Sequence, residues 1–395
     1  MSSERTIVHF DLDSFFVEVE RLQNSTLKGL PVVIGGYSDR AVVASCSYEA
    51  RKFGIHSAMP MTRAKILCPS AIIVKGNMGL YSKYSHLVTE IIEEESPLYE
   101  KASIDEHYID ITGMDRFYGS YSWAHNLRLR IIKEIGLPIS FGLSINKTVA
   151  KIATGIAKPN GEKQVLSNEV QTFLDPLPVS KIPMIGDKTN QILRSNNILT
   201  IKDLSSRSKQ DIEKLLGHYG IMVWNKANGI DNTPVIATHQ RKSISSEETF
   251  EHDITDLTII DQVIVHMVEK IAFQLRMVQK LTSCVTVKIR YADFSTETIQ
   301  KQIQYTSFDH IILSTGKELF TKLYKKEKSI RLVGIKLSNL VEGAQQIDLF
   351  NDTSEMINLY QALDNMKKRF GKDAIHRASG LKSNIDGSAS KKKPT

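Results

Sequence analysis

Two adjacent carboxylates, Asp105 and Glu106, are flanked on both sides by apolar residues that favour β-structure. Neighbouring side chains of a straight strand point to opposite faces, so the chain must turn here for both acids to reach one ligand. The flanking residues therefore predict a hairpin with strands over 98–104 and 108–111 and with the two acids at its tip. An adjacent Asp-Glu pair is most often a solvated turn, so this interpretation needs support from elsewhere in the chain.

A second acidic pair, Asp11 and Asp13, lies near the N-terminus. An apolar stretch over 6–10 precedes it and predicts a buried strand that carries Asp11 at its end. Carboxylates from two strand ends suit a hard cation such as Mg²⁺, which takes oxygen ligands and is completed by waters and substrate phosphates. A three-acid site holding two such ions suits an in-line phosphoryl displacement. On spacing alone, Asp13 would join this set.

Composition is that of an ordinary soluble protein, with 41% hydrophobic and 24% charged residues, and 395 residues suffice for two to four domains. The net charge of +7 favours a polyanionic partner such as nucleic acid, although solvated surfaces can carry a similar charge. The three cysteines show no metal-ligand spacing, which predicts free thiols. Because the sequence contains neither a membrane-spanning apolar run nor the apolar core of a signal peptide, we expect a cytoplasmic protein with no membrane contact.

The first 165 residues alternate predicted strands and helices. After the first strand, a helix through residue 21 begins at Asp13 or Ser14, either of which can cap it. The two hairpin strands are followed by a helix over 123–135, a strand over 139–145 and a helix over 147–157. This is the βαββαβ order of a ferredoxin-like unit. A long insertion after the first helix holds strands over 31–35 and 41–45, short helices over 48–54 and 59–67, and a helix over 81–95.

Residues 168–232 predict short helices. Within them, residues 182–189 resemble the hairpin of a helix-hairpin-helix, which presents backbone N–H groups to a phosphate. The usual pattern has glycine where this chain has Met184, and a plain packing corner between helices is the alternative.

A second α+β domain follows a polar linker around Pro234. Its predicted elements are a helix over 257–278, strands over 282–291 and 298–305, a helix over 310–324 and a strand over 331–340. Basic residues could gather on one face of its sheet, with a plain solvated face as the alternative: Arg241, Lys242, Lys288, Arg290, Lys301 and Lys336.

The last fifty residues predict an amphipathic helix over 355–370 and a disordered Ser/Lys-rich end over 382–395. The expected apolar face of the helix consists of Met356, Leu359, Leu363, Met366 and Phe370.

Four motifs in this chain resemble those of the Y-family translesion DNA polymerases, in the DinB (polymerase IV-like) branch. They are FDLDSFF at 10–16, SYEARKFG at 47–54, SIDE at 103–106, and SINK at 144–147 running to AKPNG at 157–161. The resemblance covers residues 6–340 and implies an α+β multidomain, right-handed polymerase. Its parts would be a ferredoxin-like (βαββαβ) palm at 1–16 and 78–165, small fingers at 17–77, a helical thumb with the helix-hairpin-helix at 166–232, a linker at 233–240, an α+β little finger at 241–341 and a tail at 342–395.

The resemblance also implies an activity: DNA-templated transfer of a nucleotide from a dNTP to a primer 3′-hydroxyl on two Mg²⁺ ions, with Mn²⁺ as an alternative. Low processivity, no proofreading and bypass of damaged bases would accompany it. Asp11, Asp105 and Glu106 match the family's catalytic, metal-binding carboxylates, and the Leu12 carbonyl matches a further metal ligand. Because the family does not use the position of Asp13 as a main ligand, we leave it out.

Nucleotide contacts follow from the same resemblance. Phe16 matches the family's steric gate, an aromatic ring beneath the incoming sugar that leaves no room for a 2′-hydroxyl. Ser45 matches a small residue near the templating base pair. The whole nucleotide-binding set is Phe15, Phe16, Ser45, Tyr48, Arg51 and Lys158, although Phe15 is expected to pack mainly in the core. The DNA-binding set is Ile185, Gly186, Lys188, Arg241 and Lys242.

The tail carries the sequence QIDLF at 346–350, which resembles the pentapeptide by which bacterial polymerases bind the sliding clamp. Leu and Phe anchors in an apolar pocket would form such a tether, and a chance apolar tail is the alternative. The clamp-binding residues would be Gln346, Ile347, Leu349 and Phe350. The implied partners are thus primer-template DNA, dNTPs and the clamp, for a monomeric enzyme.

His107 departs from the family, which usually has alanine after the acidic pair. Its ring would either reach a carboxylate or face away from the site, and the second is favoured. Two other functions are weighed against the polymerase: a DNA-binding accessory protein that has lost catalysis, and a nucleotidyl cyclase on the same palm topology. The intact carboxylates argue against the first, and the thumb, second domain and tail argue against the second.

Overall fold

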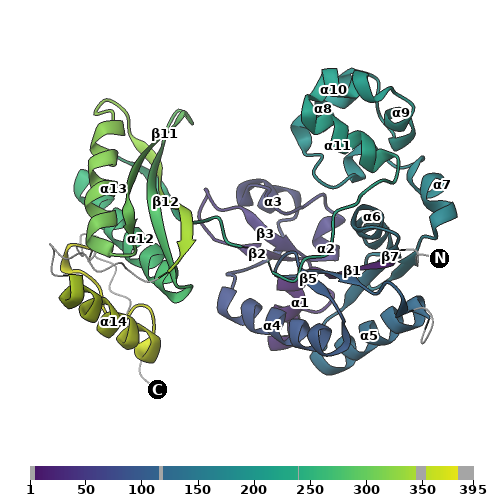
Figure 1. Ribbon diagram of the computed structural model, residues 1–395, viewed down its shortest axis with the longest axis horizontal. Helices are drawn as coiled ribbons and strands as arrows, with labels where there is room; N and C mark the ends of the chain where they lie inside the picture. The colour runs from purple at the N-terminus through teal and green to yellow at the C-terminus, as the bar shows by residue number, and fades with distance from the viewer. Residues whose placement is uncertain (1–4, 115–118, 239, 344–352, 381–395) are drawn as a thin grey trace. The chain divides into compact units, whose positions relative to one another are not determined.

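The computed structural model describes residues 5–114, 119–238, 240–343 and 353–380 (Figure 1). The chain divides into two compact units, residues 1–239 and 240–395, each with its own hydrophobic core. Within the described ranges, no helix is both long and apolar enough to cross a membrane.

A five-stranded sheet forms the centre of the first unit, with the strand order β5-β6-β1-β7-β8. The strands are β1 (Ile7–Leu12), β5 (Tyr99–Lys101), β6 (Glu106–Asp110), β7 (Ile139–Ser144) and β8 (Glu162–Gln164). β1 runs antiparallel to both β6 and β7, so the first four strands have the ferredoxin-like arrangement that the sequence predicts. β8 was not predicted, and it extends the sheet parallel to β7.

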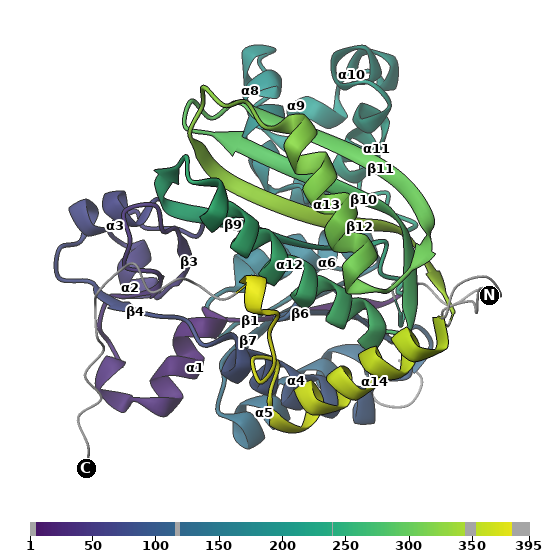
Figure 2. The same ribbon diagram turned by 90° about the vertical axis from the view of Figure 1, so that its left-hand side faces the viewer.

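Helices cover both faces of this sheet. α4 (Met78–Glu95) and α5 (Ser120–Ile135) lie side by side on one face, and α6 (Lys147–Ala157) lies on the other (Figures 1 and 2). α6 approaches β7 closely because Gly142 has no side chain. A Cβ atom there would lie 2.1 Å from the carbonyl oxygen of Ala150.

The first helix, α1 (Phe15–Gln23), begins without the predicted side-chain cap. Ser14 occupies the cap position with φ of 45°, but its hydroxyl makes no capping hydrogen bond. Asp13 instead accepts hydrogen bonds from residues distant in sequence, described below. The cap prediction is therefore wrong in its chemistry, although the helix starts where it was expected.

The insertion between α1 and α4 forms a small subdomain with its own core. Its sheet has the order β3-β2-β4. The elements are β2 (Val32–Gly35), β3 (Val43–Cys46), α2 (Tyr48–Arg51), α3 (Met61–Leu67) and β4 (Ile72–Val74), of which β4 was not predicted.

Residues 168–232 contain short helices joined by turns, as predicted, and their apolar side chains share a core with α6. The α-helices are α7 (Val170–Leu174), α8 (Asp187–Ser195), α9 (Ile201–Ser205), α10 (Lys209–Leu216) and α11 (His218–Ala227).

Met184, in the turn before α8, has φ of 79°, in the left-handed region that favours glycine. A non-glycine residue in this conformation destabilises the folded state by about 1–2 kcal/mol. Glycine would remove that strain, but its greater freedom in the unfolded chain would offset the gain by about 0.5–1 kcal/mol. We expect Met184→Gly to be more stable than Met184→Ala by about 0.5–1 kcal/mol in urea unfolding. The Met184 side chain is exposed, so Met184→Ala removes the side chain without relieving the backbone strain and serves as the matched control. An alanine variant as stable as the glycine variant would contradict the strain.

The second unit is built on a four-stranded antiparallel sheet of order β11-β10-β12-β9. Two helices, α12 (Leu257–Met277) and α13 (Asp309–Leu323), pack against it. The strands are β9 (Ser243–Ile254), β10 (Lys280–Tyr291), β11 (Thr296–Thr306) and β12 (Ile330–Glu342), of which β9 was not predicted.

The basic residues of this sheet do not all share a face. Lys288 and Arg290 alternate with buried residues along β10, and Lys336 pairs with Thr286 on the same side. Lys301 pairs with Val285, whose side chain is in the core, and its ammonium group bonds Glu318 of α13 at 2.7 Å. The expectation for Lys301 is therefore wrong, because the strand register turns it toward the helices.

The tail helix, α14 (Thr353–Phe370), packs only partly through its predicted apolar face. Met356 and Leu363 of that face are half-buried, whereas Leu359, Met366 and Phe370 are exposed. The buried side chains of the helix include Tyr360 and Asp364, which lie on a more polar side. Arg276 of α12 explains this, because its guanidinium donates to both Asp364 oxygens at 2.7 and 2.9 Å and stacks 4.8 Å from the centre of the Tyr360 ring.

Candidate active site

The predicted carboxylates converge at one end of the central strands. Asp11 of β1 pairs directly with Glu106 of β6, so their side chains share a face with Cβ atoms about 5 Å apart. The hairpin of β5 and β6 is present, with Asp105 in its turn and Glu106 opening β6. The carbonyl oxygen of Asp105 accepts a hydrogen bond from the Leu12 N–H at 3.0 Å, which fixes the turn to the end of β1.

Ser103 organises the turn that presents the acids. Its hydroxyl oxygen accepts the backbone N–H groups of Asp105 and Glu106 at 3.3 and 3.0 Å, and its hydroxyl donates to Asp105 Oδ1 at 2.6 Å. The sequence alone did not indicate that Ser103 would order this turn. A serine two residues before the turn aspartate is a recognisable signal, because such hydroxyls commonly bond local backbone groups.

A cavity of about 170 Å³ opens beside these acids. Most of the predicted metal and nucleotide residues line it, whereas Glu106 and Tyr48 lie outside its lining. The lining residues are Asp11, Leu12, Ser14, Phe15, Phe16, Ala44, Ser45, Arg51, Ser57, Asp105 and Lys158. The fold therefore gathers residues from β1, α1, the insertion, the hairpin turn and the end of α6 around one space.

Two lysines balance the carboxylates. Lys158 forms an ion pair with Asp11, and Lys151 Nζ lies 2.5 Å from Glu106 Oε2. Burial raises the pKa of Asp11 to about 7, against the opposing effect of Lys158. Burial would also raise the pKa of Glu106, but the neighbouring His9 and Lys151 side chains hold it well below its ordinary value. The potential metal-ligand atoms of these carboxylates are all oxygens, so the site fits a hard divalent cation such as Mg²⁺.

Lys151 was not identified from the sequence. α6 carries Lys147 and Lys151 one turn apart, so both point to the same side of the helix. Lys147 Nζ bonds both oxygens of the buried Glu100 at 2.7 Å. The four-residue lysine spacing on a predicted helix is the signal that could have revealed this basic side.

Asp13 links several segments around the site through hydrogen bonds. It accepts hydrogen bonds from the Tyr48 hydroxyl at 3.1 Å, the Ser140 hydroxyl at 2.8 Å and the Asn160 N–H at 2.7 Å. Both of its oxygens are thus engaged by protein donors, which agrees with leaving it out of the ligand set. The Tyr48 ring in turn packs under the Arg51 guanidinium, 4.6 Å from its centre.

The two phenylalanines behave differently. Phe15 is 3% exposed and belongs to the core that it shares with Tyr81. Phe16 is half-buried and stacks on the Tyr81 ring, with centroids 4.3 Å apart and planes 11° apart. The Tyr81 hydroxyl donates to Glu20 Oε1 at 2.6 Å, so the ring beneath Phe16 is itself held in place.

His107 faces away from the acids. It is fully buried, and its Nε2 lies 3.0 Å from the Thr89 hydroxyl on α4. Burial lowers the pKa of His107 to about 3, so the ring is neutral near pH 7. The favoured interpretation of the sequence is therefore confirmed.

The predicted DNA contacts lie on other parts of the chain. Ile185 is buried, and its backbone N–H donates to the Ile182 carbonyl oxygen at 3.2 Å. Gly186 is the N-terminal cap residue of α8, and Lys188 is exposed in its first turn. Arg241 and Lys242 are exposed ahead of β9, in the second unit. The clamp-like residues Gln346, Ile347, Leu349 and Phe350 lie outside the described residues.

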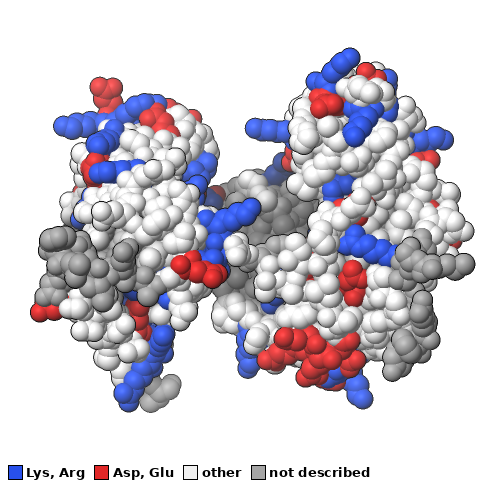
Figure 3. Space-filling view, in the orientation of Figure 1, with Lys and Arg blue, Asp and Glu red and all other residues white. Residues whose placement is uncertain are grey.

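Charge is unevenly distributed over the first unit. Acidic side chains gather on the surface over α4 and α5 (Figure 3). Glu94, Glu95 and Glu134 surround Arg130 there, with contacts of 2.6, 2.6 and 2.8 Å. A polyanion would be repelled from this face, which lies across the sheet from the lysines of α6.

Comparison with known proteins gives consistent matches. The impB/mucB/samB family matches residues 10–155, and its C-terminal domain matches residues 241–349. DNA polymerase IV of Dehalococcoides mccartyi is 39% identical over 377 residues, covering 94% of this chain and 97% of that protein. DNA polymerase IV of Treponema denticola is 33% identical over 393 residues, covering 98% of this chain and 100% of that protein.

Solved structures agree with these relatives. A chimera of the Y-family DNA polymerases Dbh and Dpo4 matches with a TM-score of 0.74 and 27% identity, over 86% of this chain and 100% of that one. DinB from Sulfolobus solfataricus matches with a TM-score of 0.59 and 25% identity over the same shares.

Proposed function

The chain belongs to the impB/mucB/samB family and is a DNA-directed DNA polymerase with the multidomain α+β fold of the Y family, and from this premise we propose that it performs translesion synthesis. The observation that carries the proposal is the meeting of Asp11, Asp105 and Glu106 beside a cavity that Arg51 and Lys158 also approach. Nucleotidyl transfer requires carboxylates that bind divalent cations and basic side chains that bind a triphosphate.

Asp11, Asp105, Glu106 and the Leu12 carbonyl would hold two Mg²⁺ ions, with Mn²⁺ as an alternative. Such ions lower the pKa of the primer 3′-hydroxyl and neutralise charge on the leaving pyrophosphate. The Ser103 hydroxyl keeps the Asp105 carboxylate oriented, and the strand register keeps Asp11 opposite Glu106. The chain's contribution is thus to position acidic oxygens in advance.

The incoming nucleotide would lie in the cavity. Arg51 offers a planar fork for phosphate oxygens and Lys158 a point charge, while Tyr48 steadies Arg51 from below. Phe16 would lie under the sugar, and the small Ser45 near the templating base pair would leave room for damaged bases. The same looseness accounts for low fidelity, and we assign the chain no proofreading activity.

We assign the polymerase parts as a palm at 1–16 and 78–165, fingers at 17–77, a thumb at 166–232, a linker at 233–240 and a little finger at 241–341. Template-primer DNA would be held by the turn before α8, through backbone N–H groups and Lys188, and by the basic residues Arg241 and Lys242. Few such contacts suit a monomeric enzyme of low processivity.

Primer extension on undamaged and damaged templates, with dNTPs and Mg²⁺, tests this function. We expect addition of a few nucleotides per binding event on the undamaged template and continued extension past at least one class of damaged base. Extension that stops at every lesion tried would contradict the translesion assignment while leaving the polymerase activity intact.

The tail motif predicts a sliding-clamp partner. Deleting residues 346–350 should leave extension on naked primer-template unchanged but reduce stimulation by the clamp more than tenfold, because two anchors worth about 2 kcal/mol each are lost. A deletion of equal length at 384–388 is the matched control. Loss of basal activity on deletion of 346–350 would instead show that the segment is structural.

A further inference from the structure

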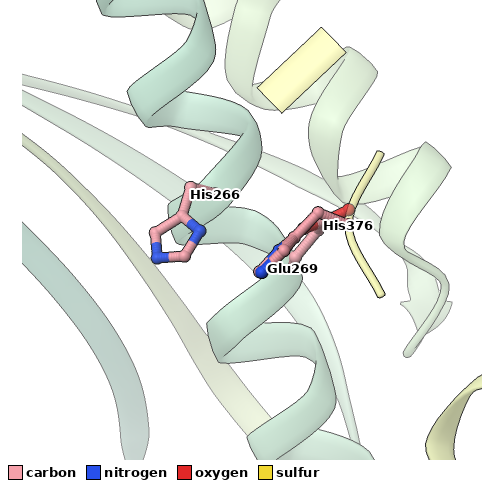
Figure 4. Close-up of side chains that lie close together, drawn as sticks. All are labelled: His266, Glu269 and His376. Carbon is pink, nitrogen blue, oxygen red and sulfur yellow. The ribbon is translucent and has the colours of Figure 1, made fainter. Parts of the chain in front are cut away.

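A second group of potential metal ligands lies in the second unit, among residues to which no role in catalysis or nucleotide binding is assigned above. His266 and Glu269 project from α12, and His376 comes from the segment that follows α14 (Figure 4). One ligand atom of each residue lies within 4.8 Å of those of the other two. His376 Nδ1 is already 3.2 Å from Glu269 Oε2.

Glu269 is oriented in advance for this contact. It is 5% exposed, and its Oε1 accepts the backbone N–H of Arg377 at 2.8 Å, which leaves Oε2 directed to His376. The Arg377 guanidinium lies 3.8 Å from the same Oε1 and donates to the Tyr360 hydroxyl at 3.0 Å. A buried carboxylate oriented by a backbone donor is the kind of support that metal-binding carboxylates receive from their surroundings.

The two α12 residues are three apart, so they lie on one side of the helix. His266 is exposed, and its ring lies 5.5 Å from that of His376. Ligand atoms in a tetrahedral zinc site are about 3.4 Å apart, given bonds of about 2.0–2.1 Å. Metal binding would therefore require the exposed His266 side chain to rotate toward Glu269 and His376.

We propose that His266, Glu269 and His376 bind a Zn²⁺-class transition-metal ion that fastens residues 371–380 to α12. Two imidazoles and one carboxylate form a donor set typical of Zn²⁺, with a water in the fourth position. Mg²⁺ and Ca²⁺ prefer all-oxygen sites, so the site differs in chemistry from the carboxylates of the first unit. The ion would bind only when the segment after α14 is folded over α12.

The fastening has a structural consequence for the tail. Residues 378–380 form a short 3₁₀ turn against α12, where a side chain in place of Gly380 would meet Val265. Arg276 of α12 already holds α14 through Asp364. The ion would add a second attachment to α12, in the segment that follows α14.

Zinc titration of the untagged full-length protein, in excess Mg²⁺ to occupy the acidic site, tests the proposal. Isothermal titration calorimetry is run on the wild type, His266→Ala, His376→Ala and the control His252→Ala, which removes an exposed histidine outside the cluster. We expect one Zn²⁺ equivalent in the wild type and control that is weakened at least tenfold in the two cluster variants, since even loss of an outer partner costs about 10–100-fold.

Thermal unfolding supplies an independent readout. Zn²⁺ should raise the Tm of the wild type and of His252→Ala, and should raise it less in the cluster variants, because an ion that binds only the folded chain stabilises it. If His376→Ala fails to fold, the exposed His266→Ala decides the matter. Equal zinc affinity and equal Tm shifts in His266→Ala and the wild type would overturn the proposal.

Discussion

Asp105→Asn is expected to lower the rate of primer extension by on the order of 10²–10³-fold, because it removes one charged ligand from the proposed cation site. Asparagine keeps the shape of the side chain, and its Oδ1 can still accept the Ser103 hydroxyl that Asp105 accepts at 2.6 Å. The turn should therefore survive. Single-turnover extension with saturating dNTP measures the chemical step, and a binding assay with primer-template checks that DNA affinity is unchanged.

The matched control for this substitution is Asp110→Asn, at the far end of β6, the strand that follows the Asp105 turn. Asp110 accepts hydrogen bonds from the Thr112 N–H and hydroxyl at 3.0 and 2.6 Å, so it has a local structural part outside the cavity lining. Its replacement should leave extension near the wild-type rate. If Asp105→Asn and Asp110→Asn extend equally well, the Asp105 carboxylate is not a ligand of the catalytic ions.

Much of the fold could be predicted because its central elements carry strong apolar patterns. The helix expected over 147–157 is α6 (Lys147–Ala157), and the hairpin and the βαββαβ order are also present. The strands that were not predicted, β4, β8 and β9, all lie at the edge of a sheet. Edge strands bury less surface, so their pairing depends on the partner strand more than on their own sequence.

The site was predictable only as far as its motifs extend. The acids, Arg51, Lys158 and the phenylalanines stand in recognisable short stretches, and the structure gathers most of them around one cavity. The contacts that support these residues could not be predicted, because they join residues that are far apart in the sequence. Asp13 with Asn160 and Glu106 with Lys151 depend on how α6 packs against the sheet. The polar packing of α14 likewise depends on one distant arginine.

Phe16→Ala should raise incorporation of ribonucleotides relative to deoxyribonucleotides by about 5–150-fold. The Phe16 ring lines the cavity and is held against Tyr81, with centroids 4.3 Å apart, so it cannot easily move aside for a 2′-hydroxyl. Forcing extra atoms into a well-packed space costs about 1–3 kcal/mol, which corresponds to the factor given. Alanine removes that obstacle.

The ratio of kcat/KM for rNTP to that for dNTP is the right measure, because Phe16 also packs against the core. Truncation will cost some stability and some activity, but a loss of folded enzyme lowers both rates equally and leaves their ratio unchanged. Phe53→Ala, which removes an exposed ring outside the cavity lining, is the matched control and should keep the wild-type ratio. A ratio that is the same in Phe16→Ala as in the wild type would mean that another group excludes the 2′-hydroxyl.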